Sequence, residues 1–157
     1  MEQIAILVDV QNIYYTTRQA FNRQFDYTAF WKSVTTGRNL IAANAYAIAP
    51  NSAKQASFQR ILSDVGFTVK LKPYIQRRDG SAKGDWDVGI TLDMLDLAEQ
   101  VNTIVLASGD GDFDLALQKV HQRYKVSTEV WGVRQLTAAS LIESAQKFVP
   151  IEDELLI

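Results

Sequence analysis

The sequence contains no cysteine and only one histidine, His121. The absence of cysteine excludes disulfides, thiolate metal sites and a thiol nucleophile. A single histidine excludes zinc sites built from two or three imidazoles. Sixteen Lys and Arg against eighteen Asp and Glu leave a net charge of −2, so any nucleic-acid-binding surface must be a local patch. Chemistry therefore falls to Ser, Thr, Lys, Tyr and carboxylates.

Long apolar runs are also missing from the 157 residues. The N-terminal segment MEQIAILVDVQN has no cationic stretch ahead of an apolar core, as a signal peptide would have. No run approaches the roughly 18 apolar residues of a membrane span. The length suits one domain. We therefore expect a soluble, cytoplasmic, single-domain protein without a membrane partner.

Short apolar, β-branched runs alternate with longer segments of helical period. The expected strands are residues 4–8, 45–49, 68–74, 103–107 and 125–131, and the expected helices lie near 14–21, 53–65, 85–101, 113–123 and 136–145. The first and fourth strands are almost continuously apolar, which is typical of central parallel strands covered on both faces. This alternation predicts an α/β fold, a three-layer sandwich with a mostly parallel, Rossmann-like sheet.

Polar residues follow two of these strands, where ligands bind in open parallel sheets. Asp9 and Asn12 follow the first strand, and Asp110 and Asp112 follow the fourth in the segment Ser108–Phe113. Asp9 and Asp112 also fit the role of helix N-caps, which aspartate often fills at such junctions. One helix needs only one cap, however, so capping alone accounts poorly for all three acids.

A further carboxylate, Asp87, lies near the start of the helix expected over 85–101. At about 100° per residue, one broad arc of this helix holds the apolar residues Val88, Ile90, Leu92, Met94, Leu95, Leu97, Ala98 and Val101. Asp87 falls inside this arc, whereas Asp93 lies about 120° from Asp87. An acid facing the core needs a cation, hydrogen-bond donors or a proton. We expect Asp87 to be functional, with a structural hydrogen bond to a neighbouring loop as the alternative.

Four acids, Asp9, Asp87, Asp110 and Asp112, are thus expected to converge from separate segments. Clustered carboxylates raise the pKa of at least one member unless a cation compensates. Oxygen ligands without His or Cys suit Mg²⁺ or Mn²⁺. Such a site fits metal-assisted hydrolysis of a phosphodiester, and it also fits a phosphatase.

A local excess of basic residues precedes Asp87 in the otherwise acidic chain. It consists of Lys70, Lys72, Arg77, Arg78 and Lys83, and nearby aromatic residues are Tyr14, Tyr15, Tyr74 and Trp86. Basic side chains can hold phosphates while aromatic rings stack on unpaired bases. The alternative is a solvated loop with strand lysines facing water.

Three motifs in order along the chain resemble those of the NYN domain, the LabA-like branch of the PIN-like metal-dependent ribonucleases. The segment from Asp9 to Asn12 is similar to an opening Asp-x-x-Asn, Lys-Gly-Asp-Trp-Asp at 83–87 to a Lys-Gly-x-Asp helix motif, and Ser-Gly-Asp-Gly-Asp-Phe at 108–113 to Ser-Gly-Asp-Ser-Asp-Phe. Residues 141–148 resemble the closing helix. The sequence departs from the pattern at Gly111, at Asp114 and at Ala145-Gln146.

The resemblance implies a Rossmann-like, PIN-like sheet, a divalent-metal site and cleavage of RNA, single-stranded or structured. It carries over five residues as functional positions, namely Asp9, Asn12, Asp87, Asp110 and Asp112, and Asp93 at lower rank. We expect the acids to bind metal and Asn12 and Ser108 to position a phosphate, with Arg77, Arg78 and Lys83 holding the RNA backbone. A non-catalytic RNA-binding or regulatory module, a phosphatase and a homodimer remain open at this point.

Overall fold

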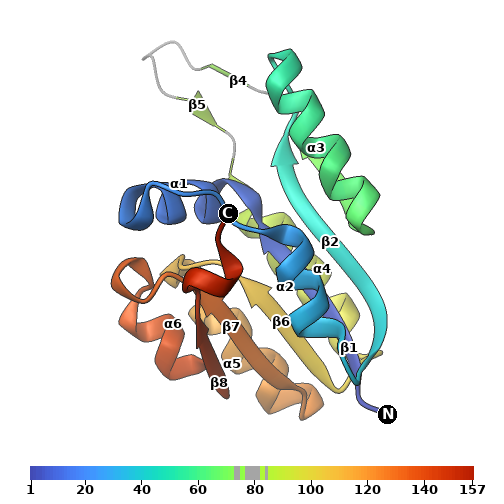
Figure 1. Cartoon of the computed structure of the whole chain (residues 1–157). Helices are drawn as coiled ribbons and strands as arrows, with labels where there is room; N and C mark the ends of the chain where they lie inside the picture. Colours follow the sequence, from blue (N-terminus) through green and yellow to red (C-terminus); the bar gives the residue numbers. More distant parts are fainter. Residues whose placement is uncertain (73–74, 77–81, 84) are drawn as a thin grey trace.

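Alternating strands and helices form a six-stranded parallel sheet covered on both faces (Figure 1). The computed structural model describes residues 1–72, 75–76, 82–83 and 85–157. The strands of the main sheet are β1 (Gln3–Asp9), β2 (Asn39–Ile48), β3 (Thr68–Lys72), β6 (Thr103–Ala107), β7 (Ser127–Gly132) and β8 (Lys147–Pro150). All five strand pairings are parallel, which confirms the predicted α/β sandwich.

Helices and short 3-10 turns cover this sheet. The helices are α1 (Val10–Phe21), α2 (Tyr27–Thr35), α3 (Ala53–Val65), α4 (Asp87–Ala98), α5 (Asp114–Tyr124) and α6 (Ala139–Ser144), and the turns are η1 (Gly111–Phe113), η2 (Arg134–Leu136) and η3 (Asp153–Leu155). A separate antiparallel pair joins β4 (Ile75–Gln76) to β5 (Ala82–Lys83). In the described residues, no helix has the length and apolar character that a membrane crossing requires.

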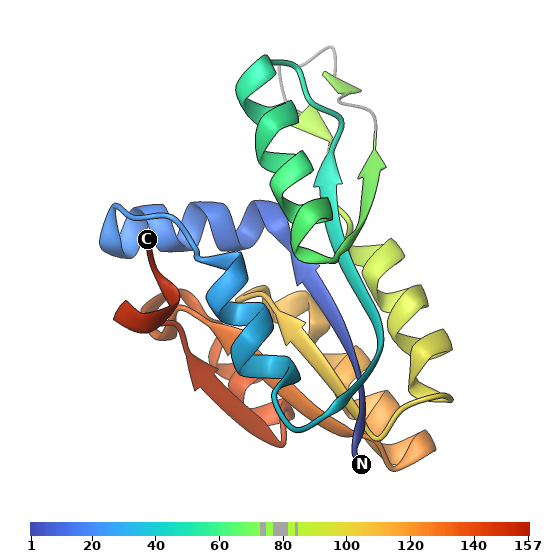
Figure 2. The same cartoon turned by 45° about the vertical axis from the view of Figure 1, so that its right-hand side comes forward.

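The central strand β1 is buried on both sides, as its apolar run predicts. Ile4 and Val8 belong to the core beneath α2 and α3, while Ala5 and Leu7 belong to the core beneath α4, α5 and α6. Figures 1 and 2 show the resulting three layers, with α1 lying across the carboxyl ends of the strands. A sheet with two buried faces needs apolar side chains at successive positions rather than alternate ones.

The strand order β3-β2-β1-β6-β7-β8 places a reversal of winding between β1 and β6. The chain moves from β1 outward to β3, and then returns to the other side of β1 to build β6, β7 and β8. The connections on either side of such a reversal diverge and leave a crevice at the carboxyl edge, where ligands of α/β proteins bind. Asp9 and the loop after β6 lie at this edge.

Several predicted boundaries are wrong. Helix α2 is missing from the sequence prediction. Residues 136–145, expected to be one helix, contain only the last residue of η2 and the short α6. Residues 141–148, expected to be the closing helix, include the start of β8, because Phe148 pairs with Val130 at the sheet edge. On α4, Val88 and Leu92 are exposed, so the apolar arc is narrower than predicted.

Candidate metal centre

Asp9 ends the central strand and begins the helix that follows it. Its side chain accepts a hydrogen bond from the Asn12 N–H at 3.5 Å, so Asp9 is the N-cap of α1. The Ser108 hydroxyl donates to the other carboxylate oxygen of Asp9 at 3.1 Å. The prediction that Asp9 is a helix N-cap is therefore correct. The cap uses only one of its two carboxylate oxygens, so Asp9 can also belong to the acidic cluster.

The loop after β6 is tied to the start of α1. The Asn12 side-chain oxygen accepts a hydrogen bond from the Gly109 N–H at 2.8 Å, and the Asp110 N–H donates to the Ser108 hydroxyl at 3.1 Å. Ser108 is fully buried. The structure thus places Asn12 and Ser108 as residues that fix Asp9 and Asp110 relative to each other.

Two glycines in this loop are explained by packing against a neighbouring segment. A Cβ on Gly109 would lie 2.7 Å from the Leu136 carbonyl oxygen, and one on Gly111 would lie 2.8 Å from the Ala138 Cβ. Neither glycine has a positive φ. The absence of a Cβ at both positions therefore lets this loop approach the segment between η2 and α6.

Asp87 is the first residue of α4, and Trp86 holds that end of the helix against the sheet. The Trp86 indole N–H donates to the Ala47 carbonyl at 2.8 Å, and its ring lies edge-on to Tyr46 with centroids 5.3 Å apart. The Lys72 ammonium lies 4.7 Å from the Trp86 ring centroid. We call Tyr46, Lys72 and Trp86 the α4 clamp, because they fix the position from which Asp87 projects.

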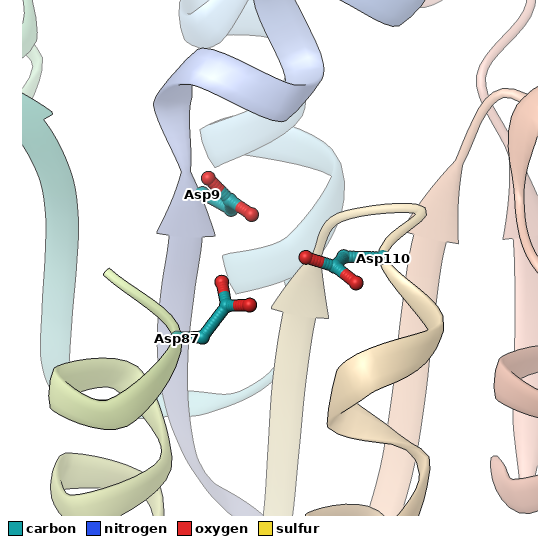
Figure 3. Close-up of side chains that lie close together, drawn as sticks. All are labelled: Asp9, Asp87 and Asp110. Atoms are coloured by element: carbon teal, nitrogen blue, oxygen red, sulfur yellow. The ribbon is translucent and has the colours of Figure 1, made fainter. Parts of the chain in front are cut away.

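The three carboxylates of Asp9, Asp87 and Asp110 point into one space (Figure 3). Each contributes one oxygen to a group in which all three atoms lie within 4.8 Å of one another. They come from β1, α4 and the loop after β6, so residues far apart in the sequence meet at the reversal of winding. The predicted convergence is confirmed for Asp9, Asp87 and Asp110, whereas Asp112, the fourth acid expected there, is not part of the group.

The cluster is electrostatically unfavourable when no cation is bound. Burial raises the pKa of Asp9 from 3.8 to about 6, and repulsion from Asp110 and Asp85 adds to the increase. The hydrogen bonds from Ser108 and Asn12 oppose it. Burial also raises the pKa of Asp87 to about 7, with repulsion from Asp110 as the next cause. Both shifts show that these carboxylates hold protons more tightly than isolated acids do.

This donor set fits a hard divalent cation. All three ligands are carboxylate oxygens, and the described part of the cluster contains no sulfur or imidazole, which matches the preference of Mg²⁺ and Mn²⁺. A divalent charge at the shared position would favour the ionised form of each acid and reverse the pKa increases. The Asp9–Asp87–Asp110 cluster can therefore hold such an ion. The three carboxylates suit Mg²⁺ and Mn²⁺ equally well.

Asp112 lies beside the cluster. Its backbone N–H donates to the Asp110 carboxylate at 2.9 Å. Its side chain is exposed, and it is one of the smaller causes that raise the pKa of Asp87. Asp85, which the sequence analysis does not single out, is a further acidic neighbour, and its side chain accepts from the Asp87 N–H at 3.2 Å. The available signal is its place two residues before Asp87 in the Lys-Gly-Asp-Trp-Asp segment.

Asp93 belongs to a different set of contacts. Its carboxylate accepts from the Tyr46 hydroxyl at 2.7 Å and from the Lys70 ammonium at 2.8 Å. The angle of about 120° between Asp87 and Asp93 around α4 explains this difference. It directs the Asp93 side chain toward Tyr46 of β2 and Lys70 of β3. Lys70 is therefore engaged in an ion pair, and Lys72 donates to the Asp85 carbonyl. Lys70 and Lys72 therefore hold α4 against β3. From the sequence, only phosphate binding or exposure to water is expected of these lysines.

The rest of the basic segment is outside what the structure describes. Arg77 and Arg78 lie among the residues not described, and only the backbone of Lys83 is described, as part of β5. Their expected role in holding RNA stays a prediction. The His121 Nδ1–H donates to the Val126 carbonyl at 3.1 Å, at the far end of α5 and away from the acidic cluster.

Gly89 provides a test of the α4 clamp. A Cβ at this position would lie 2.6 Å from Trp86 Cε3. Alanine in place of helical glycine usually stabilises a helix by about 1 kcal/mol, but Gly89→Ala is expected to destabilise by about 1–3 kcal/mol, because the indole must move. Thermal melting and Mn²⁺ titration should show a lower melting temperature and weaker binding. In a Trp86→Phe background the same change should cost less; an equal cost would contradict the role of Trp86.

Comparisons with known proteins agree with this geometry. The sequence matches the NYN domain family over residues 3–152. It is 25% identical to the Low amplitude and bright protein LabA of Synechococcus elongatus over 162 residues, covering 96% of this chain and 84% of that protein. The crystal structure of a protein of unknown function from Vibrio parahaemolyticus is similar with a TM-score of 0.95 and 55% identity, covering 99% of this chain and 96% of that one.

Proposed function

Because this chain belongs to the NYN family, we propose that it is a divalent-metal-dependent nuclease that hydrolyses phosphodiester bonds in RNA. The observation that carries the proposal is the meeting of Asp9, Asp87 and Asp110 within 4.8 Å. Three carboxylates held this close at neutral pH are unstable without a compensating positive charge. A purely structural cluster would not need to face the crevice between β1 and β6, where ligands bind in this type of sheet.

The surrounding residues support this chemistry in distinct ways. Asp9, Asp87 and Asp110 would hold Mg²⁺ or Mn²⁺, which can lower the pKa of a water molecule and polarise a phosphoryl oxygen. Ser108 and Asn12 position two of these acids through the hydrogen bonds described above. We assign to Asp112 the role of a further ligand or of an acceptor that orients the attacking water. Arg77, Arg78 and Lys83 would hold the RNA backbone.

The proposal is tested by Asp110→Asn and Asp87→Asn. Loss of a residue that merely orients a ligand typically costs about 10- to 100-fold in metal affinity or activity. Removal of a ligand itself should therefore reduce Mn²⁺-dependent cleavage of a labelled RNA by about a hundredfold or more. Calorimetric titration of Mn²⁺ should show weakened binding in both variants, while circular dichroism shows the wild-type fold.

Asp96→Asn is the matched control, because Asp96 is an exposed acid on the same helix as Asp87. It should leave cleavage unchanged. Cleavage retained in both cluster variants would contradict the assignment. RNA bound equally well in EDTA and in Mn²⁺, with no turnover, would indicate a non-catalytic module, and turnover of a chromogenic monoester alone would indicate a phosphatase.

A further inference from the structure

Two neighbouring aromatic side chains are exposed on α1, the helix whose first turn begins at the metal centre. Tyr14 is 43% and Tyr15 is 58% exposed, and within the described residues no other aromatic side chain is exposed. A single exposed tyrosine is ordinary in a soluble domain. Two adjacent ones, on the helix that Asp9 caps, place an unusual amount of apolar ring surface next to a polar site.

Helical spacing connects Tyr15 directly to the centre. Asn12 binds the loop that carries Asp110, and Tyr15 is three residues further along α1, so the two side chains are neighbours on one flank of the helix. Val10, Ile13 and Thr17 fill the opposite, buried flank. Because α1 rises about 1.5 Å per residue, Tyr15 lies within about 10 Å of Asp9 along the helix axis. Figure 2 shows this helix extending from the end of β1 across the carboxyl edge of the sheet.

The rings are held in place and carry a positive neighbour. The Arg18 guanidinium donates to the Tyr14 hydroxyl at 2.8 Å and lies 5.8 Å from the centroid of its ring. The two tyrosine rings are 5.6 Å apart with planes inclined at 72°. Fixing the rings before binding lowers the entropic cost of stacking a ligand on them. Arg18 is itself exposed, so a phosphate in solution can reach its charge.

We propose that Tyr14, Tyr15 and Arg18 form a binding surface for unpaired bases of a single-stranded nucleic acid, which directs the adjoining phosphodiester to the metal centre. The inference rests on the proposed nuclease function and names its substrate as single-stranded. Exposed aromatic faces accept any unpaired base, while an arginine beside them attracts the phosphate.

The inclination of the rings explains why the strand must be unpaired. Bases in a duplex already stack on one another in nearly parallel planes, and their faces are not available to a side chain. A strand that stacks on both Tyr14 and Tyr15 has to turn by about the angle between the rings from one base to the next, following the inclination of 72°. Only a flexible single strand can make that turn without breaking base pairs.

The test is binding of a labelled oligouridine, measured by fluorescence anisotropy in EDTA so that cleavage does not interfere. Loss of stacking costs about five- to 150-fold in affinity per base, and Tyr14→Ala/Tyr15→Ala should lose at least the lower figure. Tyr15→Phe keeps the ring and should bind as the wild type does. The wild type should bind an oligouridine with two adjacent abasic sites more weakly than the intact strand. The double variant should bind the abasic and the intact strand with equal affinity.

Tyr124→Ala is the matched control, since Tyr124 also has an arginine over its ring, with Arg123 5.4 Å from the centroid, but ends α5 at the opposite edge of the sheet. It should bind like the wild type. Oligothymidine should bind through the same rings, whereas an RNA duplex should bind at least fivefold more weakly. Equal binding of duplex and single strand, or no effect of the double variant, would overturn the proposal.

The two proposals fail in different ways. If the tyrosine variants bind and cleave like the wild type while Asp110→Asn is inactive, the base-binding surface is wrong and the nuclease stands. If the wild type binds oligouridine through the tyrosines but never cleaves it, the nuclease is wrong. If it binds no oligonucleotide at all, the surface is wrong and a protein partner becomes the better hypothesis for it.

Discussion

Asp9→Asn is expected to melt at a higher temperature than the wild type at neutral pH in EDTA, although it removes a proposed metal ligand. Folding raises the pKa of Asp9 from 3.8 to about 6, chiefly through burial. At neutral pH Asp9 is therefore ionised in both states, but its charge is less favourable in the folded protein than in the unfolded chain, which lowers the free energy of unfolding. Asparagine removes the charge. Its one oxygen can accept from the Asn12 N–H, and its NH2 group, in place of the second carboxylate oxygen, can donate to the Ser108 hydroxyl oxygen.

The pH dependence of this effect has a defined sign and window. Below about pH 4 the carboxyl is protonated in both states, and the difference between variant and wild type should be small. As pH rises, the wild type loses stability until Asp9 is ionised in the folded state above about pH 6. A shift of this size corresponds to about 2–3 kcal/mol, or several degrees in melting temperature for a chain of this length.

Saturating Mn²⁺ should reverse the order. A ligand at a thousandfold its dissociation constant stabilises the folded state by about 4.1 kcal/mol. This exceeds the disadvantage of the wild type in EDTA, and only the wild type should gain it fully. Melting curves at several pH values, with EDTA or Mn²⁺, would show the crossing, and Asp96→Asn should follow the wild type throughout. A lower melting temperature for Asp9→Asn in EDTA at neutral pH would mean that Asp9 serves mainly as a structural cap.

Arg38→Met is expected to destabilise the protein by about 3–5 kcal/mol, the cost of leaving one partner of a buried ion pair alone. Arg38 donates to both carboxylate oxygens of Glu129, at 2.8 and 3.2 Å. Both side chains are largely buried, with 15% and 8% exposed. The Trp131 indole also donates to Glu129, at 3.2 Å, but it carries no charge and cannot replace the guanidinium.

Urea unfolding would measure this loss. Glu129→Gln in the Arg38→Met background should recover part of it, because the uncompensated charge is removed while an oxygen remains for Trp131. Asp153→Asn is the control, since Asp153 is 90% exposed in its pair with Arg23 and such pairs contribute about 1 kcal/mol or less. A loss below about 1 kcal/mol for Arg38→Met would show that water compensates the Glu129 charge.

Local patterns predicted the elements that place the metal centre. The continuous apolar runs of β1 and β6 indicate buried parallel strands, and polar residues directly after such strands must lie at one edge of the sheet. Helical periodicity separated Asp87 from Asp93 on α4 correctly. These inferences succeed because each depends on backbone geometry that repeats from residue to residue.

Features that depend on long-range packing could not be predicted in this way. Helix α2 is rich in aromatic and β-branched residues, which have lower helix propensity, and burial of Phe30 and Val34 outweighs that tendency. The short β8 forms because β7 offers a partner. Likewise, Lys70 is recognisable as the partner of Asp93 only once β3 and α4 are adjacent.

The reversal of winding between β1 and β6 makes the two halves of the metal centre mechanically unequal. Asp9 and Asp110 follow strands that are paired backbone to backbone, up to Val8 and Ala107, so the spacing between them is rigid. Asp87 is carried by a separate helix, and the described contacts that fix its first turn to the sheet are made by side chains. Ions of different radius, with oxygen distances from about 2.0 to 2.6 Å, can therefore be accommodated by a small displacement of one helix while the sheet stays unchanged.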